Sequence, residues 1–244
     1  MSASDDNVRE PQRSDEGSQP PSTSYSWRAV AITFAVAAAI LAISTAIVHS
    51  GKVSHLEADV FHAINDLPGF LEPLMYVFQL LGILFVPLVV AIVAALYRKW
   101  WLNLCLVLVI PLKLFFEKKV IKEIVDRQRP GTSICHGDAT CGHFRGSVPL
   151  HGESFVSGHA IITGAVATLL FFYLGRTGRI VVIALAVMNG VARVYLGAHN
   201  PLDVVGGGAL GVCIGCILLL VFDPVRRDAR HHARVLAKGA SETA

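Results

Sequence analysis

The sequence predicts an all-α fold, a polytopic membrane bundle of six transmembrane helices with both termini in the cytoplasm. Of its 244 residues, 53% are hydrophobic and 16% are charged, whereas a soluble domain carries about 25% charged residues. The mean hydropathy is +0.56. Three uncharged runs cover residues 29–48, 73–97 and 204–222, and each is close to the roughly 20 apolar residues that cross a hydrocarbon core of about 30 Å.

Three further apolar segments complete the predicted bundle, although each is shorter or is interrupted by a polar residue. They cover residues 100–116, 155–175 and 180–192. A short apolar segment can also be a buried helix of a soluble protein, but the neighbouring segments of this chain are compatible with lipid. We therefore predict one membrane domain over residues 27–224.

Polar segments flank this domain at both ends. Residues 1–26 are rich in Ser, Pro and charge, a composition that cannot bury enough apolar surface to fold. Residues 225–244 are basic. We predict that both are cytoplasmic tails and that the protein is a multi-pass component of the cell membrane.

The Lys and Arg residues of the loops predict the orientation, because cytoplasmic loops carry an excess of them. The connections on one side and the C-terminal segment contain Arg98, Lys99, Arg176, Arg179, Arg226, Arg227, Arg230 and Arg234. The long connection over residues 117–154 lies on the opposite, outer side, yet it holds Lys118, Lys119, Lys122, Arg127, Arg129 and Arg145. A solvated basic face is one explanation of this exception, and a bound anionic ligand is the other.

The five cysteines divide into two groups. Cys105, Cys213 and Cys216 fall inside predicted spans, where a thiol is most often a small buried hydrophobe. Cys135 and Cys141 lie in the outer connection, and an oxidising compartment favours a disulfide between them. The alternative is a metal site completed by His136 and His143, although this spacing is not a common zinc pattern.

Glycines recur at four-residue spacing in the last apolar run, at Gly207, Gly211 and Gly215. Small residues at this spacing let two helix backbones approach each other closely. The pattern predicts a helix-packing face.

Lys122 and Arg129 form the first cluster of candidate site residues. Their separation of seven residues is close to two helical turns, so both would share one face if the helix persists. Pro130 disfavours helix at Arg129 and should place that side chain at a helix end. An ammonium and a guanidinium that converge in this way suit a phosphate group.

The second cluster is Ser157-Gly158-His159, at the predicted outer start of a span. A serine can cap the helix, and the free N–H groups around Gly158 favour an anion. His159 would then lie beside that anion. A simple serine cap with an interfacial histidine is the alternative.

The third cluster joins Arg193 to His199 and Asp203. Asn200 is a good helix cap and Pro201 suits a first helical position, so His199 should lie at the mouth of the last span. Asp203 could reach back to a ring nitrogen and orient the imidazole as a nucleophile or base. The alternative is that Asp203 only complements the helix dipole.

All three clusters, in this order and each at an outer membrane boundary, are far more specific than any one of them. The ordered set resembles the type 2 phosphatidic acid phosphatase superfamily, whose pattern is KxxxxxxRP, then PSGH, then SRxxxxxHxxxD. The resemblance covers residues 122–203 and the surrounding spans. Val156 and Ala192 depart from it, since the pattern has proline and serine at these positions.

The resemblance implies a catalytic role for each residue of the pattern. His199 would attack phosphorus and form a phosphohistidine, Asp203 would orient it, and His159 would protonate the leaving oxygen and later activate water. The phosphoryl oxygens would be bound by Lys122, Arg129, Arg193, Ser157 and Gly158. Because phosphoryl transfer needs mainly positioning and charge stabilisation, three cations suffice, and we expect neither a metal nor another cofactor.

We therefore expect an integral membrane phosphatase that acts on a lipid phosphate at the extracytoplasmic face of the bilayer. A polyprenyl diphosphate, such as the undecaprenyl carrier lipid, is the preferred substrate, and phosphatidate or phosphatidylglycerophosphate is the alternative. The family also includes vanadate-dependent haloperoxidases, which six spans argue against. A different class is a non-catalytic lipid-phosphate binding or transport protein, although binding alone would not need both histidines. No nucleic-acid partner is expected, because the net charge is only +3 and the apolar runs leave no basic stripe.

Overall fold

The computed structural model describes residues 26–138, 140–146 and 148–242, without the side chains of residues 238–242. The predicted tail over residues 1–26 therefore lies almost entirely outside the described residues. The described chain is all-helical and contains no β-strand. Its helices are α1 (Trp27–Val48), α2 (His55–Asn65), α3 (Glu72–Leu80), α4 (Val86–Leu96), α5 (Trp100–Phe115), α6 (Lys122–Ile124), α7 (Pro130–Ser133), α8 (Gly158–Phe171), α9 (Arg176–Tyr195), α10 (Pro201–Phe222) and α11 (Pro224–Glu242).

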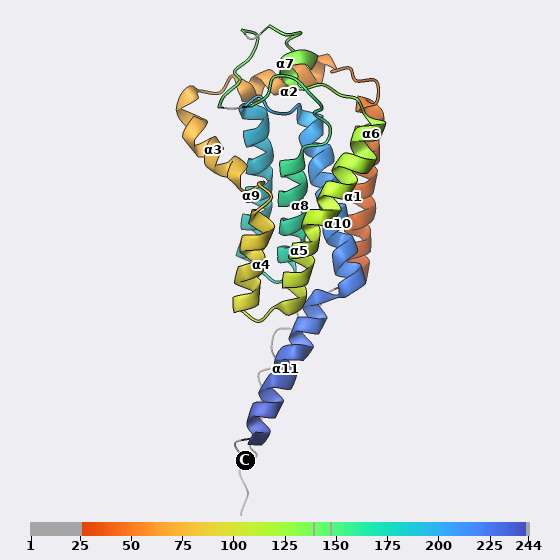
Figure 1. Ribbon diagram of the computed structural model, residues 1–244, viewed down its shortest axis with the longest axis vertical. Coiled ribbons are helices and arrows are strands. Elements are labelled where there is room, and N and C mark those ends of the chain that lie inside the picture. The colour runs from red at the N-terminus through yellow and green to blue at the C-terminus, as the bar shows by residue number, and fades with distance from the viewer. Residues whose placement is uncertain (1–25, 139, 147, 243–244) are drawn as a thin grey trace, which may run out of the picture.

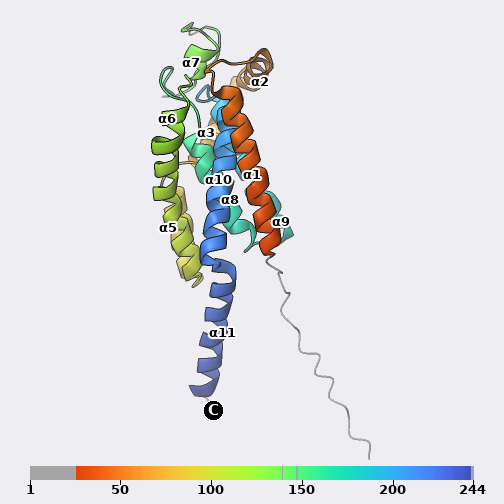
Figure 2. The same cartoon turned by 90° about the vertical axis from the view of Figure 1, so that its right-hand side faces the viewer.

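The long helices run side by side as an elongated bundle (Figures 1 and 2). At one end lie α2, α7 and the long connections, and at the other end α11 leaves the bundle. Three helices, α1, α9 and α10, are long and apolar enough to cross a membrane, and α4 and α8 are shorter apolar helices. The chain is therefore a membrane protein, whereas its six spans and its orientation remain predictions.

One predicted span is not a single helix. Residues 73–97 form α3 and α4, separated by residues 81–85. The Asn189 amide donates to the carbonyls of Phe78 (2.9 Å) and Gln79 (3.1 Å) at the end of α3. A Cβ added to Gly82 would lie 2.5 Å from the Cβ of His159. The chain therefore leaves the helical path where it is held against α8 and α9, which an apolar run cannot reveal.

The centre of the bundle is the contact between α8 and α10. A Cβ on Gly207 would lie 2.5 Å from the carbonyl oxygen of Ser157, and one on Gly211 would lie closer still to that of Ile161. A Cβ on Gly215 would lie 2.7 Å from the Cβ of Thr168 of α8. The prediction of a glycine packing face is therefore confirmed. Because only glycine fits at these positions, the backbones of α8 and α10 are in direct contact.

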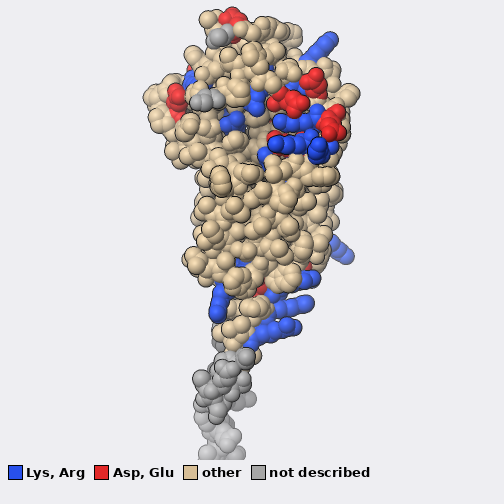
Figure 3. Space-filling model, in the orientation of Figure 1, with Lys and Arg blue, Asp and Glu red and all other residues tan. Residues whose placement is uncertain are grey.

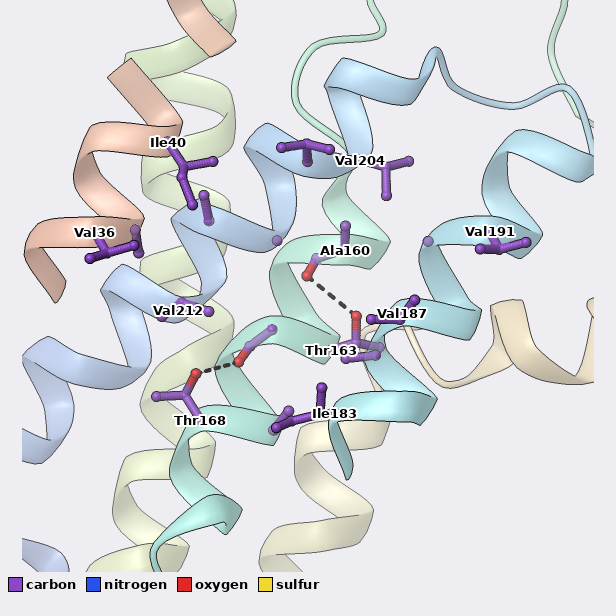
Figure 4. A pocket seen from close by; sticks show the side chains of 18 of the residues that line it. Val36, Ile40, Ala160, Thr163, Thr168, Ile183, Val187, Val191, Val204 and Val212 are labelled. Carbon is purple, nitrogen blue, oxygen red and sulfur yellow. Dashed lines mark hydrogen bonds between the residues drawn. The ribbon is translucent and has the colours of Figure 1, made fainter. Parts of the chain in front are cut away.

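An apolar cavity of about 870 Å³ lies between α1, α8, α9 and α10 (Figure 4). The described residues that line it are uncharged. The hydroxyls of Thr163 and Thr168 donate back to the carbonyls of Ala160 (3.3 Å) and Gly164 (2.8 Å) of their own helix. Their hydrogen-bonding capacity is thereby satisfied, so the cavity presents a surface that is compatible with hydrocarbon.

The predicted basic tail begins as α11, which follows a left-handed turn at Asp223 (φ 42°). Asp228 is buried (2% exposed) and accepts hydrogen bonds from the N–H groups of Trp101 (2.9 Å) and Leu102 (3.2 Å) and from the Tyr173 hydroxyl (2.8 Å). These N–H groups belong to the first turn of α5 and have no partner within their own helix. Asp228 therefore caps α5 and fixes the start of α11 to the bundle.

Candidate active site

All the predicted site residues lie at the end of the bundle opposite α11. The face in Figure 3 shows charged side chains at both ends and an uncharged band between them. The upper charged end contains α6, α7, the first residues of α8 and α10 and the last residues of α9 (Figure 1). Charged side chains at this end are therefore brought together from segments that are far apart in the sequence.

Lys122 and Arg129 do not share a helix. The helix therefore does not persist from one to the other, which was the condition for both side chains to lie on one face. The helix ends at Ile124, and Val125 is extended (φ −124°, ψ 107°). Arg129 precedes Pro130 at the start of the short helix α7, and its Nη1 donates to the carbonyl oxygen of Ala198 (2.6 Å). Arg129 thus contacts Ala198, the residue before His199, from an extended segment and not from a helical face shared with Lys122.

Ser157 occupies the N-terminal cap position of α8, but its hydroxyl makes no capping bond. Its backbone N–H donates to the carbonyl oxygen of Asp203 (2.9 Å), which ties the start of α8 to the start of α10. Its Oγ is buried and has no hydrogen-bond partner within the described part of the chain. A buried polar atom without a partner is costly, so this hydroxyl is suited to a ligand.

Arg193, at the C-terminal end of α9, is held from one side only. Its Nη1 donates to Oε1 of Gln79 at 2.5 Å, whereas its Nε is buried and lacks a partner among the described atoms. The guanidinium therefore offers a free donor at the same end of the bundle as the Ser157 hydroxyl. His159 is positioned beside it by Gly82, whose lack of a side chain admits the histidine.

His199 lies in the connection between α9 and α10, which turns at Gly197 (φ 76°). Its Nδ1 is 3.0 Å from the carbonyl oxygen of Ser154 and 3.9 Å from Oδ2 of Asp203. The Ser154 hydroxyl donates to the same carboxylate oxygen. Asp203 therefore supports His199 through Ser154, and the hydrogen bond to the carbonyl assigns the proton to Nδ1, which leaves a lone pair on Nε2.

The environment of His199 keeps its imidazole neutral. Burial, followed by the positive charges of Arg193 and Arg129, holds the pKa of His199 well below its ordinary value of 6.5. A hydrogen bond with Ser154 acts in the opposite direction and is the smaller effect. At neutral pH the Nε2 atom is consequently available as a nucleophile or base.

Asp203 belongs to a buried ion-pair network. Its other members, Arg127 and Glu57, were not among the predicted site residues. Arg127 is fully buried and bonds Oδ1 of Asp203 through Nη1 (3.0 Å) and Oε2 of Glu57 through Nη2 (2.5 Å). The other oxygen of Glu57 accepts the N–H of Leu202 (2.9 Å). Arg127 belongs to the basic run that opposes the topology rule, which was an available signal. Glu57 lies 70 residues away and offers none.

Lys113 and Glu117 form a second ion pair that was not among the predicted site residues, and their Nζ and Oε2 atoms are 2.5 Å apart. Lys113 falls inside the predicted span 100–116, and a charge within an apolar segment is a functional signal. Glu117 also lies 3.8 Å from Nζ of Lys122, which is 3.7 Å from Glu153.

The outer connection is cross-linked and braced. The structure joins Cys135 and Cys141 by a disulfide with a Cα–Cα distance of 5.4 Å. Arg145 donates to the carbonyls of Asn65 (2.8 Å) and Tyr195 (2.6 Å), so it braces the loop instead of facing an open site. No group of three or more His, Cys, Asp or Glu side chains that could hold a metal ion occurs among the residues that the structure describes.

The two positions that depart from the family pattern are both buried. Val156 (1% exposed) packs in the main hydrophobic core, and Ala192 (0%) packs in a smaller cluster with Met75, Tyr195 and Leu196. Neither side chain lies on an open surface.

Comparison with known proteins gives similar relatives. Over 140 residues the chain is 32% identical to phosphatidylglycerophosphatase B of Bacillus subtilis. The aligned region covers 52% of this chain and 63% of that protein. Over 103 residues it is 33% identical to lipid A 1-phosphatase of Rhizobium johnstonii, with coverage of 42% and 41%. The chain thus spans less than two thirds of the length of these curated relatives.

Solved structures show the same architecture. LpxE of Aquifex aeolicus superimposes with a TM-score of 0.53 at 27% identity, covering 69% of this chain and 97% of that one. The transmembrane PAP2-type phosphatidylglycerolphosphate phosphatase of Bacillus subtilis gives a TM-score of 0.55 at 24% identity, with coverage of 80% and 94%, and shares the fold. The PAP2 superfamily model matches residues 98–227, more than half of the chain. This region contains all three clusters at the charged end of the bundle, and the chain belongs to the PAP2 superfamily.

Proposed function

We propose that this protein is a lipid-phosphate phosphatase that works through a phosphohistidine on His199. The observation that carries this proposal is the setting of that side chain. His199 is buried, its Nδ1 bonds the Ser154 carbonyl (3.0 Å), and Arg129 is anchored on the adjacent Ala198 (2.6 Å). Fixed cations beside a neutral imidazole provide both a nucleophile and stabilisation for phosphoryl oxygens.

In the proposed reaction, Nε2 of His199 attacks phosphorus and the bond from phosphorus to the lipid oxygen breaks. His159 donates a proton to that leaving oxygen. In the second step, His159 takes a proton from water, whose oxygen attacks the phosphohistidine and releases inorganic phosphate. Asp203 keeps His199 oriented through Ser154.

Five groups would bind the phosphoryl oxygens. The charged groups are Lys122, Arg129 and Arg193, and the neutral donors are the Ser157 hydroxyl and the N–H of Gly158 at the start of α8. The unpartnered Ser157 Oγ and Arg193 Nε support this role, because a ligand would satisfy both. Three cations supply the charge stabilisation that phosphoryl transfer requires, so we propose that no metal ion takes part.

The proposed location of the site is the extracytoplasmic face of the cell membrane, in a domain over residues 27–224 with six spans and cytoplasmic tails. Two features support this orientation. The basic residues Arg98, Lys99, Arg226 and Arg227 belong to the opposite end, as the positive-inside rule requires. The disulfide between Cys135 and Cys141 is at the site end, and disulfides persist in oxidising compartments.

The proposed substrate is an amphiphile, and a polyprenyl diphosphate such as the undecaprenyl carrier lipid is preferred. Phosphatidylglycerophosphate or phosphatidate is the alternative, and the name of the Bacillus subtilis relative favours the former. The apolar cavity between α1, α8, α9 and α10 extends to Ala160 and Pro201, which are close in the chain to His159 and His199. Hydrocarbon could thus lie against the bundle just below the phosphate group.

The first test is release of inorganic phosphate by the purified protein in detergent, with undecaprenyl diphosphate and phosphatidylglycerophosphate in parallel and EDTA present. We expect release that survives EDTA and that falls at least about 10⁴-fold in His199→Ala, because the loss of a nucleophile removes the covalent route. Release that persists in the variant would overturn the role of His199. Phosphate-lipid binding without release by the wild type would instead favour a binding or transport protein.

A further inference from the structure

A buried ion pair lies beside the proposed phosphate site, at the end of the predicted span 100–116, and has no role in the reaction described above. Lys113 is on the last turn of α5, and Glu117 follows in the π-helical turn Phe116–Ile121. Their side chains are only 12% and 10% exposed. Ionisable groups in such a position are costly and commonly functional, and π-helical turns are frequent at functional sites.

This pair presses against the N-terminus of α8. A Cβ added to Gly158 would lie 2.9 Å from Nζ of Lys113 and 2.9 Å from Oε1 of Glu117. The same Oε1 is 3.8 Å from Nζ of Lys122. The carboxylate thus touches two groups, Gly158 and Lys122, that the proposed function assigns to phosphate, and it lies where a helix N-terminus and two ammonium groups favour an anion.

The other buried carboxylates near the site, Asp203 and Glu57, share one guanidinium. Arg127 lies 3.0 Å from Asp203 and 2.5 Å from Glu57, whereas the partners of Glu117 are the two lysines Lys113 and Lys122. Burial lowers the pKa of Arg129, and the negative charges of Asp203 and Glu117 act against this decrease. Glu117 therefore acts electrostatically on Arg129 as well as on the two lysines.

We propose that Glu117 is a built-in counter-ion of the phosphate site and that it determines how strongly the site binds phosphate groups according to their charge. In the empty site it compensates Lys113 and Lys122. In the occupied site it repels the bound anion, which weakens affinity and favours release of inorganic phosphate. The repulsion grows with the charge of the ligand, so Glu117 lowers the affinity for a diphosphate by a larger factor than the affinity for a monophosphate. The proposed preference for a polyprenyl diphosphate must then come from its hydrocarbon chain and not from the charge of its head group.

This inference rests on the proposed function, because it takes Lys122 and Gly158 as phosphate ligands. Its test measures equilibrium binding of inorganic phosphate and inorganic pyrophosphate to the full chain in detergent by titration calorimetry, and so does not depend on turnover. The variant is Glu117→Gln, which keeps the shape and removes the charge. The matched control is Glu153→Gln, because Glu153 is also near Lys122 (3.7 Å) but is 51% exposed.

We expect Glu117→Gln to bind phosphate at least about tenfold more tightly, and pyrophosphate by a larger factor, because a like charge has been removed from a poorly solvated site. Glu153→Gln should change both affinities by less than about twofold, since solvent screens an exposed charge. Equal or weaker phosphate binding by a folded Glu117→Gln protein would overturn the proposal. Equal tightening in the control would also overturn it.

A second pair of variants covers the case in which Gln at position 117 leaves Lys113 unpaired and prevents folding. Lys113→Gln and the double variant Lys113→Gln/Glu117→Gln differ only in the carboxylate, and we expect the double variant to bind phosphate more tightly. Equal affinity in these two proteins would show that Glu117 only links α5 to α8. Absence of phosphate binding by every protein, the wild type included, would overturn the phosphate site itself, and hydrolysis of lipid phosphates measured on the same samples separates these two failures.

Discussion

Two buried aspartates, one at each end of the bundle, cap helices in contrasting surroundings. Asp203 accepts the N–H of Asn200 (2.8 Å) at the start of its own helix α10 and is paired with the Arg127 guanidinium (3.0 Å). Asp228 caps the neighbouring helix α5 and is bound by two backbone N–H groups and a phenol, none of which carries a charge. The chemistry of capping is the same, but only Asp203 is connected to an ion pair and, through Ser154, to His199.

We infer from this difference that a buried carboxylate supports catalysis when the oxygen that closes the helix also reaches His199 through Ser154, and supports only architecture when both oxygens serve a helix end. In Asp228, both carboxylate oxygens accept hydrogen bonds from the backbone N–H groups of α5 or from the Tyr173 hydroxyl. The comparison therefore predicts that the two aspartates have separable effects on turnover and on stability.

The largest expected effect is on turnover in Asp203→Asn. An amide is neutral and has only one acceptor oxygen, so it cannot accept the hydrogen bonds of Ser154, Asn200 and Arg127 together. We therefore expect His199 to lose its fixed orientation. We expect kcat to fall by about 10²–10⁴-fold, with KM changed far less, in a phosphate-release assay. A KM increase without a loss of kcat would assign Asp203 to substrate binding instead and would break the comparison.

The next effect is on stability in Arg127→Met. This change leaves the carboxylates of Asp203 and Glu57 buried without their cation, and breaking a buried pair in this way costs about 3–5 kcal/mol. Thermal unfolding in detergent should show a large decrease in the midpoint. Adding Glu57→Gln should recover part of the loss, because one uncompensated charge is removed, and a further decrease would contradict the network.

Asp228→Asn should have a smaller effect, on stability alone. An amide oxygen in the place of Oδ2 can still accept two of the three hydrogen bonds, and we expect a loss of about 1–2 kcal/mol. Phosphate release per folded molecule should stay within about twofold of the wild type, because the hydrogen-bond partners described for Asp228 all lie at the end of the bundle opposite the site. A loss of turnover as large as that of Asp203→Asn would remove the distinction between the two ends.

The smallest expected effect is that of mild acid on the wild type. Because the pKa of His199 is held well below 6.5 by burial and by Arg193 and Arg129, protonation of the nucleophile begins only below that value. The acid limb of kcat/KM should therefore lie below pH 6.5, so acidification from pH 7.5 to 6.5 should lower the activity by less than about twofold. A limb at or above pH 6.5 would mean that His199 has an ordinary pKa.

Much of the fold could be predicted from the sequence, because lipid imposes long apolar segments that are visible in one dimension. The clusters around Lys122, Ser157 and His199 were also visible, since each combines cations or histidines with helix-start signals. The division of residues 73–97 into α3 and α4 was not, because it depends on Gly82 meeting His159 and on Asn189 bonding α3. Apolar composition does not record such contacts.

The support behind the site could be predicted least. Arg127 pairs with Glu57 across 70 residues of sequence, and no local pattern indicates which acid a buried arginine will meet. Lys122 and Arg129 would share one face only if the helix persisted, but it ends at Ile124, and Arg129 reaches Ala198 from an extended segment. Local spacing identifies the groups that take part, whereas tertiary contacts determine how they converge.

The direct backbone contact between α8 and α10 also has a mechanical consequence. Side chains do not separate these two helices at Gly207 and Gly211, so the interval between the ends that carry His159 and His199 is fixed by direct van der Waals contact of the two backbones. A bilayer of different thickness acts first on lipid-facing helices such as α1, where Ile32 and Ile43 are 64% and 60% exposed, and tilting relieves such mismatch. We therefore expect a change of bilayer thickness to alter the tilt of α1 more than the spacing of His159 and His199, so that the proposed chemistry would be retained across thin and thick bilayers.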